Sequence, residues 1–182
     1  MAKVTKLGIG IVTQGQMEAQ TACALISALP NAGVPFQMIL AMGCYIQYNR
    51  MNAVNIATEN QCSHLLFVDT DMFFDQMAIK KLIDHAENGL DIIGARYNKR
   101  VYPVVSTVPD ITELSSVPFC PTGFLLINME VFAKIGTPYF WLDEKVFPDS
   151  EDAYFCRRAI ECGYKVWCDP LIQIGHLGTT IY

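Results

Sequence analysis

The chain has 182 residues, of which 52% are hydrophobic and 17% are charged, and its formal net charge at pH 7 is −5. This composition indicates a folded globular protein, and the length favours a single domain over residues 1–182. The acidic balance argues against nucleic acid as the principal partner, because binding to phosphates needs a basic excess. No apolar run is as long as a membrane helix, so we expect no integral membrane segment and a cytoplasmic protein.

The first half of the chain alternates apolar segments with helical ones. Strands are predicted at 6–12, 35–42, 65–68 and 91–95, and helices at 17–29, 49–60 and 76–87, the last of them capped by Asp75. Strands and helices in this alternation predict an α/β fold with a mostly parallel central sheet and helices on both faces. The glycines Gly8 and Gly10 lie inside a strand and lack a third glycine, so they are weak evidence for dinucleotide binding.

The alternation changes after Arg96. Three prolines, Pro103, Pro109 and Pro118, predict a hairpin or a long loop at 96–118, over the working edge of the sheet. The remaining predicted elements are a strand at 123–128, a helix at 129–135, an aromatic loop at 136–148, a helix at 150–162, and strands at 166–168 and 171–174.

The seven cysteines form no CxxC pair. Most of them lie in apolar segments, where free cysteine behaves as a small hydrophobic residue. An odd number without paired spacing predicts neither a disulfide framework nor a zinc site.

Two aspartates, Asp69 and Asp71, follow directly after the apolar strand at 65–68. Carboxylates next to apolar chain are rarely buried unless they are paired or bind a metal. The carboxyl end of a central strand is also where open α/β sheets bind ligands. The alternative is a turn in which Asp71 or Asp75 caps the next helix.

Two further groups extend this pattern. Glu151 and Asp152 open a predicted helix, and His176 lies between glycines near the end of the sequence. Oxygen ligands suit Mg²⁺ or Mn²⁺, and one imidazole shifts the preference towards Mn²⁺. The alternatives are ordinary charges in a first helical turn and a surface histidine.

Taken in order, these segments resemble small GT-A-type glycosyltransferases, of the family-2-like or Anp1-like kind found in bacteria and phages. The resembling segments are VTQG (12–15), YNRMN (48–52), LLFVDTDM (65–72), DIIGARY (91–97), PTGFLLI (121–127), SEDAYFCRR (150–158) and GHLG (175–178). The resemblance implies a single-domain GT-A (Rossmann-like) fold. It also implies metal-dependent transfer of a sugar from a UDP- or GDP-sugar to a hydroxyl of a glycan or another acceptor, with inversion.

The resemblance also implies a role for each matched residue. Asp71 would bind Mn²⁺ or Mg²⁺ directly, Asp69 would contact the ribose or the water shell of the metal, and His176 would be a further ligand. Asp152 would be the general base, supported by Glu151. The remaining positions are Thr13, Gln14, Arg50, Asn52 and Thr70, beside the nucleotide, and Gly123, where the backbone would approach the sugar or acceptor. Relatives often have arginine in place of Gln14, and the loops 96–118 and 136–149 would have to serve the acceptor.

Two other readings compete with this one. A nucleotide-sugar-binding protein without transferase activity would keep the same pocket. A haloacid-dehalogenase-like phosphatase would share only the strand and its two aspartates, and those enzymes usually have threonine or valine where this chain has Phe73.

Overall fold

A computed structural model describes residues 3–99, 106–108, 110–142 and 150–178. In this part of the chain a seven-stranded sheet has the strand order β2-β1-β3-β7-β5-β8-β6. Its strands are β1 (Leu7–Thr13), β2 (Phe36–Met42), β3 (His64–Asp69), β5 (Ile92–Ala95), β6 (Ser115–Val117), β7 (Phe124–Asn128) and β8 (Val166–Asp169). A second sheet pairs β4 (Met72–Phe74) with β9 (Ile174–His176).

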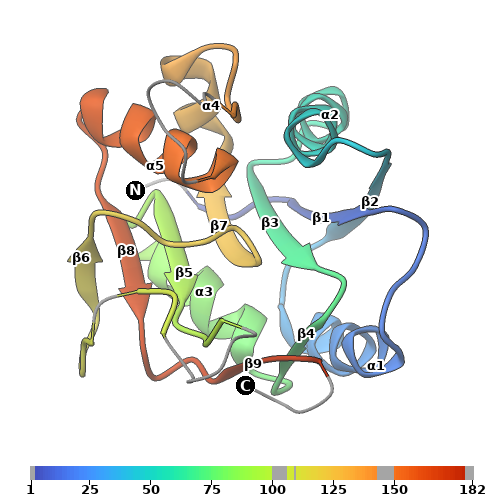
Figure 1. The fold of residues 1–182 in the computed structure, drawn as a ribbon. Helices are drawn as coiled ribbons and strands as arrows, with labels where there is room; N and C mark the ends of the chain where they lie inside the picture. Colours follow the sequence, from blue (N-terminus) through green and yellow to red (C-terminus); the bar gives the residue numbers. More distant parts are fainter. Residues whose placement is uncertain (1–2, 100–105, 109, 143–149, 179–182) are drawn as a thin grey trace.

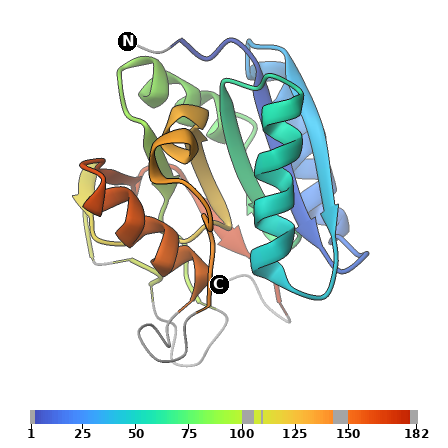
Figure 2. The ribbon, with the colours of Figure 1, turned by 90° about the horizontal axis from the view of Figure 1, so that it is seen from above.

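The helices form a layer on each face of the large sheet (Figures 1 and 2). One face carries α1 (Ala19–Ala28) and α3 (Ala78–Glu87), with the 3₁₀ helix η1 (Leu29–Asn31) after α1. The other face carries α2 (Ile46–Glu59), α4 (Met129–Ile135) and α5 (Glu151–Glu161). The predicted α/β architecture with helices on both faces is confirmed.

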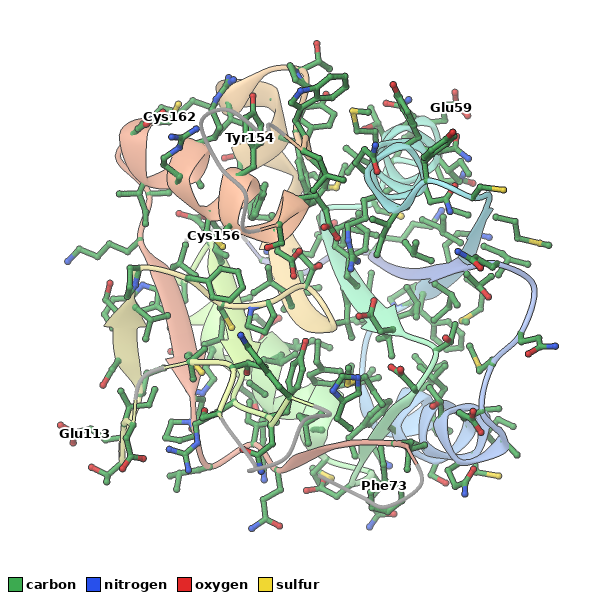
Figure 3. The ribbon with its side chains drawn as sticks, in the orientation of Figure 1. Glu59, Phe73, Glu113, Tyr154, Cys156 and Cys162 are labelled. Atoms are coloured by element: carbon green, nitrogen blue, oxygen red, sulfur yellow. The ribbon has the colours of Figure 1, made fainter. Side chains whose placement is uncertain are left out.

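Each central strand supplies both cores, because successive side chains of a strand point to opposite faces. In β3, Leu66 and Val68 pack with α1 and α3, whereas Leu65 and Phe67 pack with the other helices. Figure 3 shows side chains filling the space between α5 and the sheet, where Cys156 is fully buried. Helices on both faces therefore explain the continuous apolar runs in the sequence.

The sheet is mostly parallel, as predicted. β2, β1 and β3 are parallel neighbours, and β5 is parallel to β8. β7 lies between β3 and β5 and is antiparallel to both, and β6 is antiparallel to β8 at one edge. As a result, the carboxyl ends of β1, β2 and β3 meet at one edge of the sheet.

Several predicted boundaries are wrong. Asp75 does not cap α3: its carboxylate accepts a hydrogen bond from the Met77 amide at 2.6 Å, ahead of the first helical residue Ala78. Asp71 is not a helix cap either, since it leads into β4, a strand missing from the sequence prediction. The last strand begins at Ile174 and not at Leu171, because residues 170 and 171 form a turn.

The two proline- and aromatic-rich segments are only partly described. Within 96–118, β6 and an isolated bridge between Asn98 and Ser106 are present, while residues 100–105 and 109 lie outside the described part. In the segment predicted as an aromatic loop, Phe140 is fully buried against Phe67 and Phe155 and so belongs to the core. Residues 143–149 of that loop are also outside the described part.

Candidate active site

A cleft of about 760 Å³ opens at the carboxyl ends of β1 and β3. Its size is that of a pocket for a small organic ligand. The cleft brings together five residues predicted from the sequence, Thr13, Gln14, Asp69, Thr70 and Asp71. It is also lined by Val12, Gly15, Gln16, Gly43, Cys44, Ile46 and Asn49.

The loop after β1 is held in shape by one hydroxyl. Thr13 Oγ1 accepts hydrogen bonds from the amides of Gly15 at 3.0 Å and Gln16 at 3.1 Å, and donates to the Gln16 carbonyl at 2.7 Å. Gly15 has a φ of 115°, a conformation that favours glycine. Thr13 therefore shapes the floor of the cleft, and the exposed Gln14 follows it along the wall.

On α2, sequence reasoning chose Asn52, which is exposed and is not among the described residues that line the cleft. Asn49, one turn earlier, is buried, lines the cleft and donates a hydrogen bond to the Gly43 carbonyl at 2.9 Å. The resemblance implied Asn52, and the likeness of a short segment does not show which of two asparagines one turn apart faces the sheet. Ile46, and not Asn49, is the first residue of α2.

Asp71 and His176 face each other across the small sheet. Met72 pairs with His176 in the β4–β9 ladder, which places His176 Nε2 3.4 Å from Asp71 Oδ2. The other ring nitrogen, Nδ1, lies 3.1 Å from the Asn98 carbonyl oxygen. A hydrogen bond there orients the ring and leaves Nε2 for Asp71 or for a metal, the usual arrangement of metal-binding histidines.

The donor set fits a hard divalent cation only in part. Two ligand atoms that share an octahedral cation at about 2.1 Å are about 3 Å apart, close to the Asp71–His176 separation. Among the described residues, however, no three histidine, cysteine, aspartate or glutamate side chains form a group that could hold a metal ion. The remaining positions would fall to water and ligand oxygens, as is common for Mg²⁺.

Arg50 connects the cleft to α5. Its Nη2 donates to Asp69 Oδ1 at 3.3 Å and its Nε to Glu151 Oε1 at 3.1 Å, and the guanidinium lies over the Phe67 ring. The residue is only 2% exposed. Sequence reasoning placed Arg50 beside the nucleotide; the described cleft lining does not include it, and two carboxylates occupy its Nε and Nη2 donors.

The charged groups around Arg50 change one another's pKa values. Burial alone would lower the pKa of Arg50, but the negative charges of Asp69, Asp152 and Glu151 outweigh it, so its pKa lies above the usual value and the guanidinium stays charged. Burial raises the pKa of Glu151, the neighbouring charge of Asp152 raises it further, and Arg50 opposes both effects. Burial likewise raises the pKa of Asp69 against the influence of Arg50.

Asp152 has different surroundings from Glu151. Ser150 caps α5 by accepting a hydrogen bond from the Ala153 amide, so the helix begins at Glu151, one residue after the predicted start. In that turn, Asp152 Oδ2 accepts a hydrogen bond from the Thr122 amide at 3.2 Å. Asp152 also lines a second cavity of about 770 Å³, whose walls include Pro118, Phe119, Pro121, Ala153 and Arg157.

Gly123 sits where no side chain fits. A Cβ atom there would overlap the Tyr97 hydroxyl and lie 2.7 Å from Met72 Cε, while the Gly123 carbonyl accepts the Asp69 amide at 3.0 Å. Tyr97 was overlooked from the sequence. It is buried, its ring packs edge-on against His176, and burial together with the charges of Asp69 and Asp152 raises its pKa.

Comparison with known proteins gives a fold but no family. No family model and no curated protein matches the chain. The crystal structure of A197 from STIV matches with a TM-score of 0.69 and 19% identity, over 96% of this chain and 86% of that one. The structure of GalNAc-T7 with UDP, GalNAc and Mn²⁺ matches with a TM-score of 0.65 and 12% identity, over 97% of this chain and 44% of that one.

The fold is similar to that of GT-A glycosyltransferases. Similarity at these identities shows the fold alone, so the roles of individual residues rest on the geometry of the site. Among the described residues, no helix combines the length and the apolar character needed to cross a membrane.

Proposed function

We propose that the chain is a metal-dependent glycosyltransferase that moves a sugar from a UDP- or GDP-sugar to an acceptor hydroxyl. The observation that carries the proposal is the cleft in which the Asp69-Thr70-Asp71 tip of β3 meets the loop after β1, with His176 beside Asp71. The similarity to GalNAc-T7, whose structure contains UDP, GalNAc and Mn²⁺, supports it.

In this proposal Asp71 and His176 hold Mn²⁺ or Mg²⁺, and Asp69 contacts the ribose or the water shell of the metal. The bound metal would offset the negative charge that develops on the leaving diphosphate. Thr13, Gln14 and Thr70 shape the nucleotide-binding part of the cleft, and Asn49 replaces Asn52 as the α2 residue that faces it. Arg50 is assigned to holding Asp69 and Glu151 in place.

Asp152 is the proposed general base. A hydroxyl is a poor nucleophile at neutral pH, so a carboxylate must take its proton as the oxygen attacks the anomeric carbon. The sugar–diphosphate bond then breaks on the opposite face, the nucleoside diphosphate leaves with the bonding pair, and the anomeric centre inverts. Glu151 supports Asp152 by keeping Arg50 next to the first turn of α5.

The proposal treats residues 1–182 as one catalytic domain and places the protein in the cytoplasm. The acceptor, a glycan or another hydroxyl compound, would enter from the second cavity, since Asp152 lines it.

Calorimetry with UDP and with GDP tests the proposal. We expect one of them to bind in the presence of Mn²⁺ and to bind far more weakly in its absence. Asp71→Ala should remove the metal-dependent binding, whereas Asp84→Ala, at an exposed carboxylate of α3, should leave it unchanged. The absence of metal-dependent binding to either nucleotide would contradict the proposal.

Two results would favour the competing functions. Nucleotide binding without transfer to a broad acceptor panel and without donor hydrolysis indicates a binding protein. Hydrolysis of a generic phosphate ester that is lost in Asp69→Asn indicates a phosphatase.

A further inference from the structure

The strand β2 lies at an open edge of the large sheet. It pairs with β1 on one side, and no described strand pairs with its other side. Figure 2 shows it as the outermost strand beside β1. The backbone N–H and C=O groups of such an edge can pair with another strand. One of them, the Met38 carbonyl, accepts a hydrogen bond from the Gln37 side chain at 3.1 Å.

One face of β2 is apolar and uncovered. Ile39 and Ala41 point towards α2 and are buried. The alternate residues point to the opposite face and are large, apolar and exposed: Phe36 by 45%, Met38 by 44%, Leu40 by 58% and Met42 by 59%. Exposed apolar side chains that lie next to one another in this way mark an interaction surface more often than scattered ones do.

The strand also lacks the usual protection of an edge. Natural edge strands carry charged residues or proline, contain bulges, or are covered by another element. The sequence of β2 is FQMILAM, without charge or proline, and it pairs with β1 residue for residue from Phe36 to Met42 without a bulge.

The sequence of β2 is complementary to itself. If two copies pair in antiparallel fashion with Ile39 on the twofold axis, Phe36 lies opposite the partner's Met42, and Met38 lies opposite the partner's Leu40. Every exposed side chain then meets another large apolar side chain. A closed dimer of identical subunits requires this kind of self-matching surface.

We propose that β2 is the interface of a twofold dimer in which the two large sheets join edge to edge, antiparallel and centred on Ile39. The partner is a second copy of this chain. The inference rests on the edge strand alone and is independent of the proposed catalytic activity.

The first test is the mass in solution, measured by sedimentation equilibrium over a wide range of concentrations. A monomer has a mass of 20.3 kDa, so a dimer should give twice that value. A wild-type protein that stays monomeric at every concentration overturns the proposal.

The second test locates the interface and its register. Met38→Lys and Leu40→Glu should each halve the mass under conditions where the wild type is dimeric. Each substitution places a charge opposite an apolar side chain of the partner, and the twofold axis brings the like charge of the second copy to the diagonal position. An equimolar mixture of the two variants should return to the dimeric mass, since position 38 of one copy lies opposite position 40 of the other.

Leu171→Lys is the matched control. Leu171 is 68% exposed in the turn before β9, so the same change in chemistry there should leave the dimer intact. Circular dichroism checks that the variants are folded. If the single variants are folded and remain dimeric, β2 is not the interface. If the mixture does not form dimers, the proposed pairing of position 38 with position 40 is wrong.

Discussion

Neighbouring carboxylates at the start of α5 have different partners. Glu151 is buried and its oxygen binds the Arg50 guanidinium, whereas Asp152 accepts only a main-chain hydrogen bond among the contacts described and lines an open cavity. Glu151 is only 6% exposed and its oxygen is occupied by Arg50, so an acceptor hydroxyl cannot reach it. A carboxylate at the wall of a cavity can meet an acceptor hydroxyl. The difference assigns proton removal to Asp152 in the proposed reaction.

Asp152→Asn should separate binding from transfer. The side-chain oxygen of the substituted residue can still accept the hydrogen bond from the Thr122 main-chain amide, so nucleotide affinity should be unchanged in calorimetry. Loss of the base should reduce the transfer rate by about 100-fold or more. Glu130→Gln, in the first turn of α4, is the control at a comparable helical position away from the site. Full transfer activity in Asp152→Asn would show that the base is another residue.

The sequence predicted the positions of individual residues in the fold where a short local pattern determines them. Asp69 and Asp71 were placed in the cleft because they follow an apolar strand, and Ser150 was placed at the start of α5 by its acidic neighbours. The Arg50–Glu151 contact joins residues 101 positions apart, and no local pattern encodes such a pair. The burial of Tyr97 beside His176 depends on where two distant segments pack, so it was missed for the same reason.

Three elements meet at Arg50. It belongs to α2, Asp69 ends β3, and Glu151 begins α5, so a single buried guanidinium sets the spacing of a strand and two helices. The network adds little to stability when it is complete, since burial of the charges costs nearly as much as their attraction returns. Removal of Arg50 is different, because it leaves the Glu151 carboxylate buried without its ion-pair partner.

Arg50→Met should therefore destabilise the protein by about 3–5 kcal/mol. Arg50 lowers the pKa of Glu151, so its loss raises that pKa further above the unfolded value. The folded state then binds more protons than the unfolded state, and stability must increase as the pH falls towards the pKa of Glu151 in the unfolded chain. Urea denaturation of the variant at about pH 7 and about pH 5 should show a higher midpoint at the lower pH.

Lys80→Met provides the comparison, since Lys80 pairs with Asp84 on the exposed face of α3. An exposed pair of this kind contributes at most about 1 kcal/mol, and its loss should leave the pH dependence of stability as it is in the wild type. If Arg50→Met were as mild as Lys80→Met, Arg50 would not hold the three elements together.

At the scale of the whole molecule, two cores on either side of one sheet leave the carboxyl ends of β1 and β3 free to form the cleft. The alternation of apolar and helical segments was enough to predict this architecture. It could not predict that β7 enters the sheet antiparallel, because a strand buried on both faces reads the same in either direction. The short strand β4 was also missed, because its three residues are too few to show an alternation of apolar and polar side chains.

Because the proposed ligands bind only the folded chain, Mn²⁺ and nucleotide together should raise the melting temperature. At about 100 times the dissociation constant, the stabilisation is about 2.7 kcal/mol. For a chain of this length that corresponds to roughly 5–10 °C, measurable by differential scanning fluorimetry. Asp71→Ala should show no such shift. An equal shift in the presence of a chelator would mean that nucleotide binding needs no metal.

The proposed metal site also joins the two strands of the small sheet. Asp71 leads into β4 and His176 lies in β9, so an ion held by both side chains also fastens a late segment of the chain to its middle. Coupling of this kind is reciprocal: a bound ion would stabilise the β4–β9 pair, and a well-docked β9 would raise the affinity for the ion. In the proposed enzyme, the metal would act as a removable cross-link between segments about a hundred positions apart, formed and released without any covalent bond.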